Sequence, residues 1–263
     1  MKIIRYIAAA FSMYTKIPMP HFELDGKDCS RAILFLPLPG ILIATCVYIA
    51  DHFMYDHGIP LLVRVCAAVL IPTVITGGFH VDGFCDTVDV LSSYKSRDEK
   101  LRIMKDPHIG SFAVTGLGVA ALLLMCAFGI ILGKASGSVY PANTVAALSS
   151  VFVISRALAA LTSLYMKKAK DDGMLVSETK IRDSAGFTVI SVWLLACAVF
   201  TLYTGLKYFF AVWIAFLVFT AYYAYITRKE FGGVTGDTAG YYVTAGEIAA
   251  AGAIALVALI FGS

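Results

Sequence analysis

The chain has 263 residues, of which 59% are hydrophobic and only 15% are charged, and its net charge is +3. Soluble domains carry about a quarter charged residues, so this composition excludes an ordinary soluble domain, and so small a net charge gives no reason to expect nucleic acid as a partner. Several uncharged stretches approach the roughly 20 residues that cross a bilayer as a helix. The alternating segments of about ten residues that mark a membrane β-barrel are not evident. We therefore expect an all-α polytopic membrane protein in which residues 1–263 form a single integral-membrane domain.

The first expected element is a short amphipathic helix, Met1–Tyr14, which we place at the membrane interface and which Pro18 and Pro20 would end. About seven membrane-spanning helices follow it. In chain order they are Ala32–Ala50, Leu61–Phe79, Ser111–Gly133, Ala135–Ser155 with a continuation to about Tyr165, Ser184–Leu206, Tyr208–Thr227 and Ile248–Ser263. Arg64 lies near one end of the second span, where its side chain can reach the interface.

Lysine and arginine residues gather in alternate connections between the predicted spans. They are numerous before the first span, between the second and third, and between the fourth and fifth, whereas the intervening connections hold one or none. Because basic connections stay in the cytoplasm, this pattern predicts a cytoplasmic N-terminus and an outer C-terminus. The polar connections then share the cytoplasmic face, which predicts an active site on the cytoplasmic side of the inner membrane.

Three aspartates, Asp82, Asp86 and Asp89, lie in the stretch GGFHVDGFCDTVDV, residues 77–90, directly after an apolar run. Positions i, i+4 and i+7 share one face of a helix. Unpaired carboxylates among apolar neighbours are unfavourable, and oxygen ligands select hard cations, so the spacing predicts a Mg²⁺ site, with Mn²⁺ as a second candidate ion. Gly83 would let a phosphate or a second helix approach closely. The alternative is a solvated acidic face on a helix that enters water.

Four further residues are candidates for the same site. His80 is a possible general base, although a structural role suits it about as well. Lys105, beside Asp106 in KLRIMKDPHIGSF, brings a positive charge that suits a phosphate-bearing substrate, and ordinary anchoring of a basic connection is the alternative. Arg156 lies in the inner half of the fourth span, where charges are usually functional or paired. We expect it to face an aspartate or a substrate phosphate, with snorkelling to the membrane edge as the alternative.

A glycine-rich stretch, GGVTGDTAG at residues 232–240, precedes the last predicted span. Its backbone N–H groups around Gly236 and Thr238 are suited to an anion-binding nest, although the GK[ST] ending of a Walker A loop is missing. Asp237 is a candidate to complete the metal site from this end of the chain, and so is Glu247 at the entry to the last span. A plain flexible loop is the alternative.

The motifs together predict Mg²⁺-dependent transfer of a phosphate-linked group at the cytoplasmic membrane surface. They also resemble the motifs of the cobalamin synthase family, the adenosylcobinamide-GDP ribazoletransferases. The resemblance covers nearly the whole chain in the same order. It rests on TKIPMP, TGGFHVDGFCDTVDV, RIMKDPHIGSF, SRALAAL, more loosely AKDDGM, and GGVTGDTAG with the following Glu247.

This resemblance implies an enzyme of cobalamin biosynthesis that transfers the cobinamide-phosphate group of adenosylcobinamide-GDP to α-ribazole, or to its 5′-phosphate, and releases GMP. On this hypothesis four carboxylates hold Mg²⁺ on the diphosphate and two cations bind phosphate oxygens, namely Asp82, Asp86, Asp89 and Asp237, and Lys105 and Arg156. His80 or one of the aspartates would accept the hydroxyl proton. The expected partners are the two substrates and the lipid bilayer, together with a possible homo-oligomer or an association with other enzymes of corrin assembly.

Other functional classes remain open from the sequence. The DGxxDxxD core also resembles that of CDP-alcohol phosphotransferases, but the Ala-Arg pair that follows their first motif is missing here. A divalent-cation or proton-coupled transporter would use the same aspartates along a permeation path, yet the polar groups lie at one face and no inverted repeat is evident. A structural subunit of a membrane complex is the third class, and it would tolerate charge-neutral changes at Asp86 or Asp89.

Overall fold

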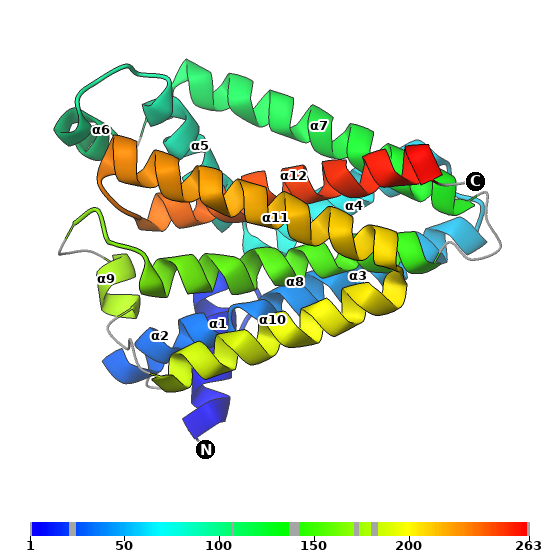
Figure 1. The fold of residues 1–263 in the computed structure, drawn as a ribbon, viewed down its shortest axis with the longest axis horizontal. Coiled ribbons are helices and arrows are strands. Elements are labelled where there is room, and N and C mark those ends of the chain that lie inside the picture. The colour runs from blue at the N-terminus through cyan, green and yellow to red at the C-terminus, as the bar shows by residue number, and fades with distance from the viewer. Residues whose placement is uncertain are drawn as a thin grey trace.

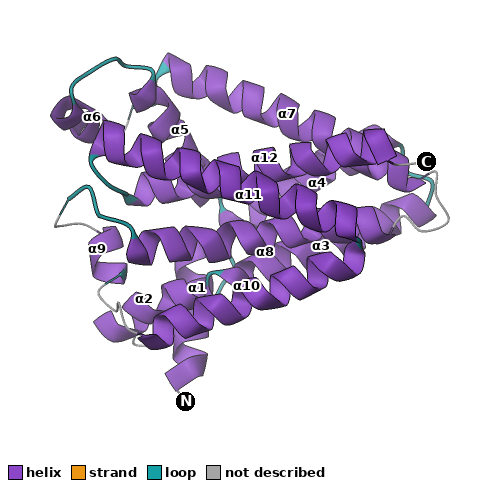
Figure 2. Ribbon diagram, viewed as in Figure 1, coloured by secondary structure: helices purple, strands orange, loops and turns teal. Residues whose placement is uncertain are grey.

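The computed structural model describes residues 2–20, 25–106, 108–136, 142–170, 174–179 and 184–261. In this part of the chain every regular element is a helix, and the sole β feature is an isolated bridge between Lys168 and Val234 (Figure 2). Six described helices are long and apolar enough to cross a membrane, or seven spans are present if one bent pair counts as a span. The prediction of an all-α polytopic membrane protein is confirmed. The side of the membrane on which each terminus lies stays a prediction.

The helices run side by side as a bundle, with their connections at its two ends (Figure 1). In chain order the elements are α1 (Lys2–Tyr14), α2 (Gly26–Ala32), a 3₁₀ turn (Ile33–Phe35), α3 (Pro37–Asp56), α4 (Leu61–Thr76), α5 (Phe79–Leu91), α6 (Arg97–Ile103), α7 (Ser111–Ser136), α8 (Ala142–Tyr165), α9 (Met174–Glu178), α10 (Ser184–Thr204), α11 (Leu206–Ile226), a π-helical turn (Thr227–Phe231) and α12 (Gly236–Phe261). The span in α8 is 83% buried and forms the centre, whereas that in α11 is 17% buried and lies at the periphery.

Several predicted boundaries differ from the observed ones. Helix α3 begins at Pro37, because proline lacks an N–H and has a fixed φ that suits the first turn of a helix. The fourth span begins at Ala142 rather than Ala135, because α7 continues to Ser136. The largest correction concerns the last span, which begins at Gly236 and not at Ile248. The second half of the predicted glycine-rich loop, residues 236–240, therefore forms the first turn of α12.

Arg64 does not extend to the interface as predicted. Its side chain is buried, and its Nε donates a hydrogen bond of 2.8 Å to Oδ1 of Asp51 in α3. The guanidinium also lies over the ring of Tyr55, 5.0 Å from the ring centroid. The charge is thus neutralised between α3 and α4 instead of being placed in water.

The second predicted span, Leu61–Phe79, ends early because two glycines interrupt it. Gly77 and Gly78 have φ values of +64° and +81°, in the left-handed region that glycine adopts without a steric penalty. Helix α4 ends just before them, and α5 leaves at 96° to it. The bend turns the aspartate motif away from the direction of the span. It places α5 at the end of the bundle that also holds α6 and α9 (Figure 1).

Small residues bring α5 and α12 into backbone contact. A Cβ on Gly83 would lie 2.7 Å from the carbonyl oxygen of Asp237, and a Cβ on Gly240 would lie 3.0 Å from the carbonyl oxygen of His80. The hydroxyl of Thr244 donates to that same His80 oxygen at 3.2 Å. Of the two predictions made for Gly83, close approach of a second helix is the one that the structure confirms.

The substitution Gly83→Ala is expected to destabilise the protein by about 1–3 kcal/mol, because the added methyl group must push α5 away from the backbone of α12. Gly118→Ala is the matched control, since the Cβ at Gly118 would enter open space on α7. Alanine there is expected to leave stability unchanged or slightly improved. Thermal unfolding of both variants in one detergent measures the difference. Equal midpoints for Gly83→Ala and the wild type would contradict the backbone contact.

Candidate active site

A cleft of about 550 Å³ opens at the bend between α4 and α5. Two of the three predicted aspartates, Asp82 and Asp86, line it, one turn apart on α5 as their spacing predicts. Lys16, just after α1, and His108, just before α7, line it as well. Asp82 is exposed and Asp86 is half-buried, so both carboxylates are accessible from the cleft. The chain thus gathers acidic and basic groups from three separate segments around one opening.

Asp89 lies at the edge of this group and does not line the cleft. Its carboxylate rests against Gly110, where a Cβ would overlap it, and Oδ1 accepts a long hydrogen bond of 3.4 Å from the N–H of Ala113. These contacts place Asp89 at the N-terminus of α7. Unpaired N–H groups at a helix N-terminus favour a negative charge there. Its contacts therefore favour the start of α7, and its predicted part in a metal site stays a prediction.

Asp82, Asp89 and Asp237 all lie near enough to Asp86 for their charges to repel its own. Such repulsion favours a cation among them, and a set of carboxylate oxygens is the kind of donor set that Mg²⁺ prefers. Within the described residues, however, no three histidine, cysteine or acidic side chains are arranged to hold a metal ion together. The donor chemistry fits magnesium, and the metal site itself stays a prediction.

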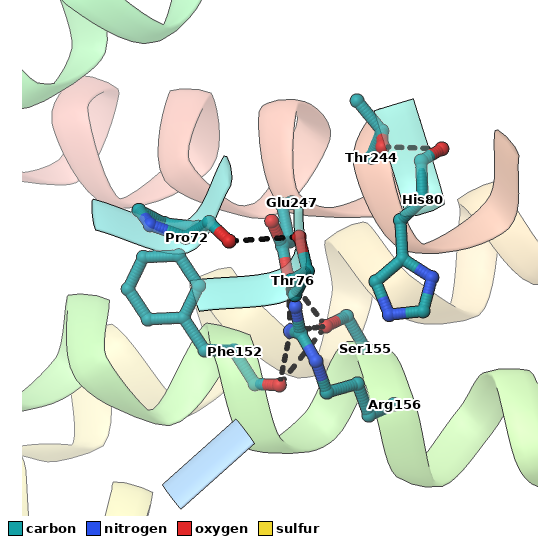
Figure 3. Close-up of polar contacts among 8 residues, drawn as sticks. All are labelled: Pro72, Thr76, His80, Phe152, Ser155, Arg156, Thr244 and Glu247. Atoms are coloured by element: carbon teal, nitrogen blue, oxygen red, sulfur yellow. Dashed lines mark hydrogen bonds and ion pairs between the residues drawn. The ribbon is translucent and has the colours of Figure 1, made fainter. Parts of the chain in front are cut away.

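His80 faces away from the cleft. Residues separated by two positions along a helix differ by about 200° around its axis. His80 and Asp82 therefore project to nearly opposite sides of α5. The imidazole is buried and is directed toward Arg156 inside the bundle (Figure 3). Its Nε2 has no hydrogen-bond partner among the described residues. This placement favours the structural alternative for His80 over a role as general base.

Arg156 pairs with Glu247, and the prediction that it faces an aspartate of the motif is wrong. Nη1 of Arg156 donates to Oε1 of Glu247 at 2.7 Å and to the carbonyl oxygen of Phe152 at 2.8 Å (Figure 3). The hydroxyl of Ser155 donates to the same carboxylate oxygen at 2.9 Å. Both charged side chains are buried, so Arg156 does not snorkel either. Glu247 lies about three turns inside α12 rather than at its entry.

Thr238, predicted to bind an anion with Gly236, takes part in capping α12. The N–H of Thr235 donates to Oγ1 of Thr238 at 2.8 Å, and the N–H of Thr238 donates to Oγ1 of Thr235 at 3.1 Å. This reciprocal pair satisfies N–H groups at the helix start. The hydroxyl of Tyr223 also donates to Oγ1 of Thr238 at 3.2 Å. Thr238 is fully buried, so a substrate has no access to its side chain.

Lys105 and Asp106 are exposed between α6 and α7 and do not line the cleft. Asp106 accepts a hydrogen bond of 3.0 Å from the N–H of His108, and its Oδ1 lies 2.6 Å from Nδ1 of that residue. The hydrogen bond from the His108 side chain lowers the pKa of the Asp106 carboxyl. Because His108 itself lines the cleft, this segment adjoins the opening. Pro107 of the same motif lies outside the described residues.

The other polar connections meet at the same end of the bundle. The N–H of Val234 donates to the carbonyl of Lys167 at 2.8 Å, and the N–H of Ala169 donates back to the carbonyl of Val234 at 3.0 Å. Lys100 of α6 forms an ion pair with Glu230, which follows α11. The predicted convergence of the polar connections on one face is confirmed (Figure 1). Residues 171–173 of the AKDDGM stretch lie outside the described residues.

Lys16 is a charged cleft residue for which the sequence predicted no role in the site. It belongs to TKIPMP, one of the motifs that carry the family resemblance, and it is one of the basic residues that precede the first span. Its position in that motif is the sequence feature that could have identified it as a site residue. No regular spacing connects it with the aspartates about 66 residues later.

Comparisons with known proteins agree with the motifs. The model of the family described as cobalamin-5-phosphate synthase matches residues 6–255. A Lachnoclostridium phytofermentans protein named adenosylcobinamide-GDP ribazoletransferase is 34% identical, over 100% of this chain and 98% of its own. Proteins of the same name from Treponema denticola and Clostridium botulinum are 30% and 29% identical, over 91% and 94% of this chain and 93% and 95% of their own. No solved structure matches the chain significantly.

Proposed function

The chain belongs to the cobalamin-5-phosphate synthase family, and from this membership we propose that it acts as an adenosylcobinamide-GDP ribazoletransferase. It transfers the cobinamide-phosphate group of adenosylcobinamide-GDP to a hydroxyl of α-ribazole, or of its 5′-phosphate, and releases GMP. The observation that carries the proposal is a family match over residues 6–255, a range that includes Asp82 and Asp86 in their accessible cleft. The family match favours this activity over a CDP-alcohol phosphotransferase or a cation transporter.

Asp82 and Asp86 are the residues of the cleft that would hold Mg²⁺, with Asp89 and Asp237 adding negative charge nearby. The ion, when bound, neutralises the diphosphate and stabilises the leaving phosphate. The ribazole hydroxyl oxygen forms a bond to the phosphorus that carries cobinamide, and the bond from that phosphorus to the GMP oxygen breaks. A carboxylate of the cleft accepts the hydroxyl proton, because His80 faces the interior of the bundle.

The cleft is proposed to lie on the cytoplasmic side of the inner membrane. The connections rich in lysine and arginine lie at the end of the bundle that holds α5 and α6, whereas the opposite end holds the connections with few basic residues (Figure 1). Basic connections remain on the cytoplasmic side of a membrane. Two large polar substrates would then reach the cleft from the cytoplasm without crossing the bilayer.

The direct test uses the full chain purified in detergent and returned to lipid. Adenosylcobinamide-GDP, α-ribazole and Mg²⁺ are added, and GMP and the corrinoid product are separated by chromatography. Equal amounts of GMP and product are expected, and omission of α-ribazole is expected to stop both. A wild-type protein that forms no GMP across a range of lipids and metal ions would refute the proposed activity.

Removal of divalent cations is expected to stop the reaction. Excess EDTA should lower GMP release to background, and added Mg²⁺ should restore it, because the diphosphate would otherwise approach carboxylates of the same charge. Ca²⁺ at equal concentration is the matched control. It is expected to restore less GMP release than Mg²⁺, because it is larger and less strict in its coordination geometry. Full turnover in EDTA would contradict the metal requirement and leave the family assignment unaffected.

A further inference from the structure

Lys16 brings a positive charge to the cleft that holds Asp82 and Asp86. It is the sole lysine or arginine among the described residues that line this opening, and its side chain is exposed. It forms no ion pair with either carboxylate or with any other described residue. The cleft therefore contains two carboxylates and one ammonium group that are not directly paired with one another.

The backbone of Lys16 is fixed to the bend between α4 and α5. Its N–H donates a hydrogen bond of 2.8 Å to the carbonyl of Ile75, and its methylene groups cross Gly77 so closely that a Cβ there would overlap them. Just before it, Oγ1 of Thr15 donates to the carbonyl of Phe11 at 2.6 Å and accepts the N–H of Ile17 at 3.3 Å. The segment after α1 is thus held in place on both sides of Lys16. The position of its ammonium group follows from a defined backbone and not from a free tail.

These three groups together match one kind of ligand. An anion alone would be repelled by the two carboxylates, and a cation alone would leave the ammonium group without an anionic partner. A diphosphate that carries a divalent cation presents positive charge to the carboxylates and negative oxygens to the lysine. Anchoring of Lys16 to lipid headgroups is the plain alternative, since lysines near a membrane edge often have that role.

We propose that Lys16 binds a phosphate oxygen of the nucleotide-linked diphosphate in this cleft, an inference that rests on the proposed function. The proposed contact is to the phosphate on the guanosine side of the substrate. When the bond to the cobinamide phosphate breaks, the electron pair stays on the GMP oxygen, and the nearby ammonium group stabilises that charge. Lys16 is therefore a substrate-binding residue of the site and not merely a membrane anchor.

The test compares Lys16→Gln, which keeps most of the stem over Gly77, with Lys2→Ala at the exposed start of α1, the helix that precedes Lys16. Lys16→Gln is expected to lower kcat/KM for adenosylcobinamide-GDP by about 10- to 100-fold and to leave KM for α-ribazole unchanged. Lys16→Arg is expected to recover part of the loss, because the positive charge returns. Lys2→Ala is expected to match the wild type. Thermal midpoints of all variants show whether the fold is intact.

A second measurement separates this inference from the proposed function. Binding of GDP in the presence of Mg²⁺ is measured by calorimetry on the same purified full-length proteins, and Lys16→Gln is expected to bind GDP at least ~10-fold more weakly. Wild-type kcat/KM and wild-type GDP affinity in Lys16→Gln would overturn the role of Lys16 even if the wild type releases GMP. If the wild type released no GMP, the proposed function would fail, and the GDP measurement alone would decide on Lys16.

Discussion

Asp82→Asn and Asp86→Asn are each expected to lower the rate of GMP release by about 100-fold or more, because each removes a negative charge from the cleft in which the metal-bound diphosphate is proposed to lie. Asparagine has nearly the same size and keeps one oxygen, so the fold is expected to survive. Initial rates of GMP release at saturating Mg²⁺ measure the effect, and a higher Mg²⁺ requirement in either variant would identify the lost group as a metal ligand.

Two further aspartates serve as controls for these variants. Asp56→Asn removes an exposed carboxylate at the end of α3. This residue lies near the start of α4, whereas the cleft lies at the other end of that helix, so the rate should be unchanged. Asp89→Asn is expected to have a smaller effect than Asp86→Asn, since Asp89 contacts the start of α7 instead of lining the cleft. Full activity in Asp82→Asn would refute the metal-site hypothesis. Equal losses at Asp86 and Asp89 would favour the original three-ligand prediction.

The buried ion pair between Arg156 and Glu247 accounts for the second large expected effect. Glu247→Leu leaves the guanidinium of Arg156 buried without its anionic partner, which is expected to lower stability by about 3–5 kcal/mol. The double variant Arg156→Met with Glu247→Leu should recover much of that loss, because apolar side chains of similar size leave no unpaired charge in the bundle. Thermal unfolding in detergent measures both variants against the wild type.

Lys229→Met is the matched control for this experiment. The exposed ammonium group of Lys229 lies 3.7 Å from the half-buried Glu230, which keeps its ion pair with Lys100, and a surface contact of this kind contributes roughly 0–1 kcal/mol. Its loss should therefore change the midpoint little. Two results would contradict the buried ion pair. One is a Glu247→Leu protein as stable as the wild type, and the other is a double variant no more stable than Glu247→Leu alone.

The local features of this protein could be predicted from its sequence. The four-residue spacing of Asp82 and Asp86 fixes their common face on any helix, and the structure places both in one cleft. The alternation of basic connections likewise predicted that the polar connections meet at one end of the bundle, as they do. Both inferences depend on regularities within a few residues or on a count along the chain, and neither requires knowledge of how the helices pack.

Features that depend on helix packing could not be predicted in the same way. Arg156 and Glu247 are separated by 91 positions, so their pairing depends on the relative depth of α8 and α12 in the bundle. The glycines at residues 232–240 favoured a loop, because glycine disfavours helices in isolation. Gly240 is nevertheless helical, since its lack of a side chain permits the contact with α5. Tertiary contact overrode local propensity at this point.

The contact between α5 and α12 also bears on the order in which the molecule is assembled. Every residue that lines the cleft precedes α7, so the ribosome has synthesised the complete set before half of the chain exists. Helix α12, against whose backbone Gly83 packs, comes last among the described helices. Until it arrives, nothing holds α5 from that side. Competence to bind substrate is therefore expected only after α12 has entered the membrane and packed against α5.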